Sequence, residues 1–156
     1  MKGSNKIQTY YLHGLKEAPT LAKLIDPVLR EAGFNTEDIE SVQEEYEIKT
    51  ELAAVEIDRC LKKAGKPVIF LQAKPVGRKD LFKVDYKKTF SAAKVAEVTF
   101  CIFTDGIYWE FYAINQSLEA SNPQFLKRIE ILYDLSRQDE VALTLRNLRE
   151  SIQNEN

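Results

Sequence analysis

The sequence predicts an α+β fold in which a central mixed β-sheet is flanked by helices. Two alternating runs, Val55–Cys60 and Val68–Lys74, are separated by Gly65-Lys66-Pro67, a break typical of the connection between antiparallel strands. A helical pattern over Asp80–Ala96 then leads to an apolar run at Val98–Thr104, as in a crossover between two strands of one sheet. Hairpin and crossover together predict the mixed sheet.

Length and composition fit one domain. The chain has 156 residues, 44% of them hydrophobic, which is enough to form the core of a single domain spanning residues 1–156. No apolar run approaches a membrane span and the first residues lack a signal-peptide core, so we expect a cytoplasmic protein without a membrane partner. Cys60 and Cys101 fall in expected strands and are predicted to be free, buried thiols.

The N-terminal third contains one strong helical pattern and one strand. The residues before it predict only an arm or a short strand around Tyr10-Tyr11-Leu12. Apolar residues at steps of three and four predict a helix over Glu17–Ala32, with Pro19 in its first turn and Gly33 as its C-cap. Val42–Ile48 alternates as a strand. We expect one side of that strand to carry Val42, Glu44, Tyr46 and Ile48.

The C-terminal third predicts a hairpin followed by two helices. Asp105-Gly106 is a tight turn signal, and Ile107–Ile114 is predicted to return as the hairpin partner of Val98–Thr104. Two helical patterns follow the cap Ser121-Asn122-Pro123 and join near Ser136. They carry Phe125, Leu126, Ile129, Leu132 and Leu135 in the first, and Val141, Leu145, Leu148 and Ile152 in the second. Four hairpin aromatics can stack on nucleic-acid bases or pack against core helices: Tyr108, Trp109, Phe111 and Tyr112.

Three polar residues on the central strands form a candidate site. Asp58 falls on the first strand, and Gln72 and Lys74 follow two residues apart on the next, so that antiparallel pairing brings them together. A carboxylate and a second oxygen hold a hard divalent cation, and a lysine steadies the attacking water and the charge growing on phosphate. The pattern is typical of a metal-dependent phosphodiesterase. A buried ion pair between Asp58 and Lys74 is the alternative interpretation.

Asp58 followed by Gln72-Ala73-Lys74 resembles the core of the PD-(D/E)XK nucleases. More narrowly, the segment from Glu17 to Tyr112 resembles the N-terminal nuclease domain of the restriction subunit of type I restriction-modification enzymes. The ordered matches are Glu17-Ala18-Pro19-Thr20, Leu24–Leu29, Gly33-Phe34, Ile57-Asp58, Gly65-Lys66-Pro67, Gln72-Ala73-Lys74, Phe103–Gly106 and Trp109–Tyr112. The resemblance implies a restriction-endonuclease-like fold and a DNA endonuclease that acts either with other restriction-system subunits or alone.

The same resemblance implies a cofactor and roles for the site residues. Mg²⁺ or Mn²⁺ is expected on Asp58, Glu17 and Gln72, with Lys74 orienting water, although a carboxylate such as Glu17 is also favoured at a helix N-terminus by the dipole alone. Gln72 stands where the family has a glutamate and brings no negative charge, so we expect weaker metal binding. Lys88 and Ala92 stand where the family has Gln and Tyr. The alternative is a nuclease-fold protein that binds nucleic acid or a protein partner without cutting.

Charge is distributed unevenly along the chain, although the net charge is only -2. Residues 59–94 contain eleven Lys or Arg against two acids, whereas residues 31–58 contain ten acids against one lysine. Lysines and arginines beside a metal-binding carboxylate suit a phosphate backbone. We therefore expect nucleic-acid contacts from Arg78, Lys79, Lys83 and Lys87. An ordinary solvated helix face, or docking and self-association driven by charge, would explain the same pattern.

Overall fold

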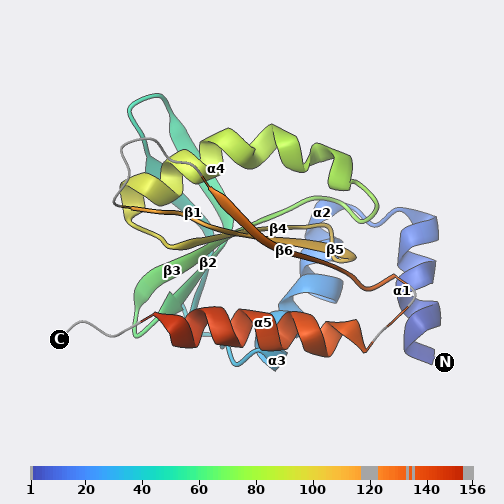
Figure 1. Ribbon diagram of the computed structural model, residues 1–156. Helices are drawn as coiled ribbons and strands as arrows, with labels where there is room; N and C mark the ends of the chain where they lie inside the picture. Colours follow the sequence, from blue (N-terminus) through green and yellow to red (C-terminus); the bar gives the residue numbers. More distant parts are fainter. Residues whose placement is uncertain (1, 117–122, 133, 135, 153–156) are drawn as a thin grey trace.

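The computed structural model describes residues 2–116, 123–132, 134 and 136–152 (Figure 1). Its single sheet has the strand order β1-β2-β3-β4-β5-β6. The strands are β1 (Val42–Lys49), β2 (Ala54–Lys63), β3 (Lys66–Ala73), β4 (Phe100–Thr104), β5 (Tyr108–Ala113) and β6 (Gln124–Glu130). Neighbours are antiparallel except for β3 and β4, which are parallel. The predicted mixed sheet is confirmed.

Helices cover both faces of the sheet. They are α1 (Lys2–His13), α2 (Glu17–Thr20), the π-helical turn η1 (Leu21–Ile25), α3 (Asp26–Glu31), the 3-10 turn η2 (Lys79–Leu81), α4 (Phe82–Ala96) and α5 (Arg137–Ser151). Helix α4 lies on one face, and α3 and α5 lie on the other (Figure 1). Each face has its own buried cluster, with Trp109 on the α5 side and Phe103 on the α4 side. Cys60 and Cys101 are buried, free thiols, as predicted.

Residues 17–31 form one helix that widens in the middle. The π turn lies just before Pro27. Proline cannot donate a backbone hydrogen bond and its ring crowds the carbonyl four residues earlier, so a wider turn lets the helix continue past it. The helix ends as predicted at Gly33, whose φ of 99° allows Phe34 N to donate to Leu29 O at 3.0 Å. Among the described helices, none is long and apolar enough to cross a bilayer.

Two N-terminal predictions were wrong. Residues 2–13 form a helix rather than an arm or strand, because Ile7 and Tyr10, three residues apart, both pack against the core. In β1 the alternation breaks at Glu45, which has a φ of 50°. Val42 therefore joins the α5-side cluster while Tyr46 packs on the α4 side, so the four residues expected on one side are divided between the two faces.

The predicted helix at Phe125 is instead strand β6, paired antiparallel with β5. Tyr112 pairs with Phe125 whereas Phe111 pairs with Lys127, which leaves Leu126 as an extra residue in a β-bulge. A bulge shifts the two-residue period of a strand, so the apolar spacing imitates that of a helix. Leu135 and Ser121-Asn122 lie outside the described residues. The second pattern is confirmed as α5.

Candidate functional site

The candidate site lies where β2 and β3 separate. Their pairing ends at Arg59 and Leu71; residues 54–58 continue along β1 only, and Gln72 and Ala73 continue along β4. The sheet therefore forks at this point, and backbone groups on the inner sides of the fork lack strand partners. Asp58 lies on one arm of the fork and Gln72 on the other.

Gln72 closes the fork with its amide group. Its Nε2 donates to Glu56 O at 3.0 Å and to Thr89 Oγ1 at 3.2 Å, and its Oε1 accepts from Asp58 N at 3.1 Å. An amide donates and accepts like a peptide group, whereas an ionised carboxylate only accepts. The side chain is 3% exposed. Gln72 thus replaces strand hydrogen bonds, and its oxygen meets the backbone of the residue that carries the candidate carboxylate.

Asp58 is a half-buried carboxylate with one engaged oxygen. Its Oδ2 accepts from Ala73 N at 2.7 Å, and within the described part of the chain its Oδ1 accepts no hydrogen bond. Burial raises the pKa of Asp58 to about 6; the Ala73 bond and Lys74 oppose this rise, and the negative charges of Glu17 and Asp85 add to it. The Ala73 hydrogen bond and Lys74 therefore only partly offset the cost of the negative charge on ionised Asp58. A bound cation would stabilise that charge.

Lys74 pairs with an acid that the sequence had not indicated. Its Nζ lies 2.8 Å from Asp85 Oδ2 on α4, so the ion pair with Asp58 that was the alternative interpretation of the two residues does not form. Asp85 is 3% exposed and also lies 3.0 Å from Lys88 Nζ. Asp85 follows Phe82 by three residues and precedes Thr89 by four, and all three are buried. An acid within the buried stripe of a helix was the signal that could have found it.

Glu17 is brought towards the fork by the helix that it begins. Its charge acts on Asp58, which places the two acids in one electrostatic neighbourhood. One contact ties this helix to the loop after β3 and another ties it to β2. Val76 N donates to Thr20 Oγ1 at 3.2 Å, and Arg59 Nε and Nη2 donate to Asp26 at 3.0 and 3.1 Å. Asp26 and Arg59 are both buried.

The loop after Lys74 is held by the turn between β4 and β5. Lys74 N donates to Thr104 O at 3.0 Å, and Gly77 N donates to Asp105 Oδ2 at 3.1 Å. Gly106, at a φ of +87°, lies so close to Leu24 that a Cβ atom would meet its side chain at 2.8 Å. Asp105-Gly106 is a turn, as predicted, and it also fixes the loop that follows the candidate lysine.

No family model and no curated protein matches the chain. A solved structure does: a fragment of a protein provisionally described as an HsdR subunit of a type I restriction enzyme from Vibrio vulnificus YJ016. The TM-score is 0.51 and the sequence identity 21%, over 90% of this chain and 27% of that one. The fold is restriction-endonuclease-like. At this identity the likeness shows the fold alone, and this chain spans about a quarter of the length of the matched one.

The described acidic side chains near Asp58 do not form a complete set of metal ligands. Within the described residues, no three or more His, Cys, Asp or Glu side chains converge closely enough to hold a metal ion. The donors near Asp58 are nevertheless carboxylate oxygens, which are the ligands that Mg²⁺ and Mn²⁺ prefer. Any ion held here would need water or a phosphate oxygen to complete its coordination.

The four basic residues expected to contact nucleic acid lie on η2, α4 and the loop before them. Arg78 is exposed and paired with Asp80, at 3.0 Å between Nε and Oδ1. Lys79 Nζ lies 3.9 Å from the centre of the Tyr108 ring. Lys83 and Lys87 are exposed, one helical turn apart on α4. Lys83 and Lys87, four residues apart on α4, therefore lie on one stripe of that helix, whereas Lys79 belongs to the 3-10 turn before it.

We expect Asp58→Asn to stabilise the metal-free protein at neutral pH. Because burial raises the pKa of Asp58 from 3.8 to about 6, the folded state binds the proton more tightly than the unfolded chain does. Asp58 therefore does not destabilise the folded protein below the unfolded pKa of 3.8. Its destabilising effect grows as pH rises from there to the folded pKa of about 6. Asparagine keeps an acceptor for Ala73 N without the charge. The gain at pH 7 should be about 1–3 kcal/mol.

Urea unfolding between pH 4 and pH 8 (about two units either side of the raised pKa) would check this. The difference between wild type and variant should vanish at the acid end and level off above the raised pKa. Asp80→Asn, which removes an exposed acid, is the control and should show no such rise. A variant less stable than wild type at neutral pH would mean that Asp58 is an ordinary structural carboxylate.

Proposed function

We propose that this protein is a metal-dependent DNA endonuclease domain of restriction type, which hydrolyses phosphodiester bonds at the fork between β2 and β3. The observation that carries the proposal is the gathering of Asp58, Glu17, Asp85 and Lys74 at that fork, with the Asp58 charge under-compensated. The restriction-endonuclease-like fold supports it. DNA and other restriction-system subunits are the partners that the proposal implies.

In this proposal Asp58 and Glu17 hold Mg²⁺ or Mn²⁺. A bound divalent cation would supply a more acidic water and neutralise charge on the scissile phosphate. Lys74, held by Asp85 at 2.8 Å, keeps its ammonium group at the fork, where it donates to a phosphate oxygen and stabilises the charge that grows there. Gln72 acts indirectly in this scheme, because its amide fixes the backbone of Asp58.

The second candidate function is nucleic-acid binding without cleavage. One observation favours it: Gln72, at the position of the family glutamate, is engaged with the backbone of β2 and with Thr89. A site short of one carboxylate binds a divalent cation less tightly. The exposed Lys83 and Lys87 would still attract a phosphate backbone.

Metal titration by calorimetry, followed by plasmid cleavage in the same buffer, separates the two functions. For an endonuclease we expect wild type to bind Mn²⁺ and nick the plasmid, and Asp58→Asn and Lys74→Met to cut at least about 100-fold more slowly. Asp80→Asn is the matched control and should cut normally. If the protein shifts the mobility of labelled DNA in a gel but leaves the plasmid intact with either metal, its function is nucleic-acid binding without cleavage.

A further inference from the structure

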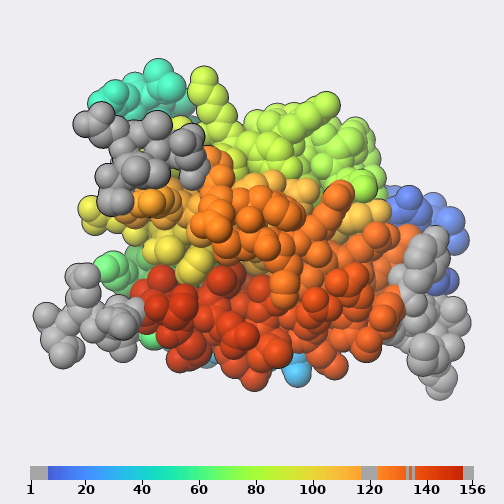
Figure 2. Space-filling model, viewed as in Figure 1, coloured from blue at the N-terminus to red at the C-terminus, as the bar shows by residue number. Residues whose placement is uncertain are grey.

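Helix α4 leaves part of its own face of the sheet uncovered. Its main contacts are with β1 to β4, and beyond it β5 and β6 form the end of the sheet. The surface of β6 is open between α4 and α5 (Figure 2). We call the uncovered group on this face the aromatic platform. It consists of Tyr108, Tyr112, Phe125, Arg128 and Lys79.

The β5 aromatics divide between the two faces. Trp109 and Phe111 are fully buried in the α5-side core. Tyr112 is partly buried against the α4-side cluster, and Tyr108 is partly buried against both clusters. The bulge at Leu126 brings Phe125 onto the α4 side with Arg128, although the two are three residues apart. Phe125 is 53% exposed, an unusual position for a phenylalanine.

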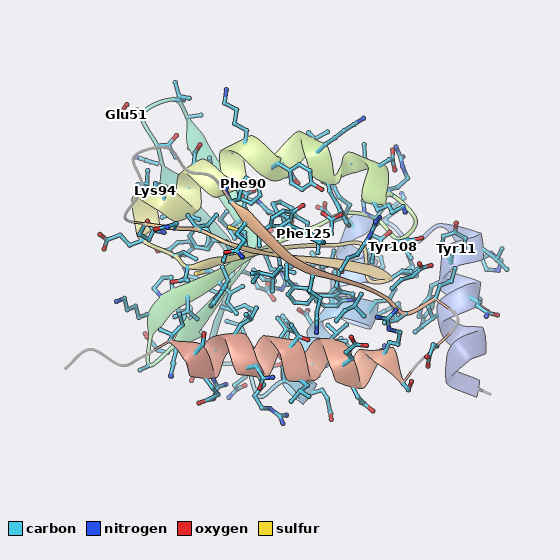
Figure 3. All side chains as sticks on the ribbon, in the orientation of Figure 1. Tyr11, Glu51, Phe90, Lys94, Tyr108 and Phe125 are labelled. Atoms are coloured by element: carbon cyan, nitrogen blue, oxygen red, sulfur yellow. The ribbon has the colours of Figure 1, made fainter. Side chains whose placement is uncertain are left out.

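Rings and cations alternate on the platform. Lys79 Nζ and Arg128 Cζ lie over the Tyr108 ring, at 3.9 Å and 5.3 Å from its centre. Phe125 lies 5.5 Å from Tyr112, with its ring tilted 70° to it. Phe125 and Tyr108 are labelled in Figure 3. The acids beside them include Glu110, whose Oε1 accepts from the hydroxyls of Tyr86 and Tyr112 at 2.6 and 3.3 Å, and Glu130, which pairs with Tyr108 across β5 and β6.

We propose that the aromatic platform binds single-stranded nucleic acid, with a base stacking on Phe125 and phosphates contacting Lys79 and Arg128, the two cations that lie over the Tyr108 ring. An exposed ring bordered by cations matches the two halves of a nucleotide, whereas duplex DNA hides its base faces. Lys127 and Arg128 on the edge strand disfavour the other simple occupant, a second copy paired along β6.

The platform begins at the same end of the sheet as the candidate site. Lys79 follows Lys74 by five residues, and Asp105, which holds the loop between them, also accepts from Tyr108 N at 2.8 Å. A strand bound on the platform would therefore lead towards the fork. This part of the inference rests on the proposed function; binding by the platform does not.

Fluorescence anisotropy with labelled oligothymidylate tests the platform. The experiment uses the Asp58→Asn background in EDTA, so that neither cutting nor metal contributes. We expect Phe125→Ala to weaken binding about 10-fold or more, as for loss of one stacked base. Tyr108→Ala should weaken binding less, because it removes only the ring over which the two cations lie. Leu143→Ala removes an equally exposed apolar side chain, 53% in both cases, on α5 and should change nothing. An abasic oligonucleotide should bind wild type as poorly as oligothymidylate binds Phe125→Ala.

Three results would overturn the platform: no oligothymidylate binding by wild type, equal binding by the Phe125→Ala and Leu143→Ala proteins, or equal binding of abasic and normal strands. A dimer that Phe125→Ala dissociates in sedimentation, without any oligonucleotide binding, would assign the surface to a second copy. Failure of the proposed nuclease function gives a different result. The plasmid then stays intact, whereas the platform variants still bind oligothymidylate more weakly than the parent protein does.

Discussion

Arg59→Met is expected to lower the free energy of unfolding by about 3–5 kcal/mol. Arg59 is 8% exposed and donates to both oxygens of Asp26, and its Nη1 donates to Asp58 O at 2.9 Å. Removing the guanidinium leaves the Asp26 carboxylate buried without its partner. The same pair joins the helix that begins with Glu17 to the strand that carries Asp58, so any cleavage activity should fall with it.

The double variant Arg59→Met with Asp26→Leu is the informative comparison, because replacing both charges removes the stranded carboxylate. We expect it to recover much of the lost stability in urea unfolding. Arg78→Met is the surface control, and breaking its exposed pair with Asp80 should cost far less, because solvent screens an exposed ion pair. Equal losses from Arg59→Met and Arg78→Met would show that the buried pair contributes no more than a surface one.

Gln72→Glu is expected to destabilise the metal-free protein by about 3 kcal/mol at pH 8. A carboxylate at this 3% exposed position cannot donate to Glu56 O, now 3.0 Å from Gln72 Nε2, and adds a charge beside Asp58. Burial and the neighbouring acids raise the pKa of such a group, so the loss should disappear as pH falls through that raised pKa.

Divalent cations should reverse part of this loss if the fork is a metal site. Ligand that binds only the folded state adds stability by mass action, so Mn²⁺ should raise the urea midpoint of Gln72→Glu more than that of wild type. Thr89→Val, which removes one partner of Gln72 without adding charge, should lose about 1 kcal/mol and gain no more from Mn²⁺ than wild type does. A Gln72→Glu protein as stable as wild type in EDTA would show that the amide does not hold the fork.

Local sequence patterns predicted most of the strands and helices, because the pattern of each element is set by residues close together in the sequence. Alternation over Val68–Lys74, helical spacing over Asp80–Ala96 and the Asp105-Gly106 turn each lie within a short segment, and the mixed sheet follows from their order. The pattern failed at β6. There the bulge at Leu126 gave a strand the spacing of a helix, and pairing with β5 outweighed the local preference.

The sequence by itself determined the order of the elements between Glu17 and Ile114, the restriction-endonuclease-like fold that its motifs resemble, and the separation of acidic from basic segments. Only the tertiary structure decided the partners. Lys74 pairs with Asp85 rather than Asp58, Gln72 bonds to the backbone of β2, and Phe125 shares a face with Tyr112. These contacts depend on where β2 leaves β3 and where β6 bulges. Such features arise from pairing between distant segments, and residue spacing within one segment carries no information about them.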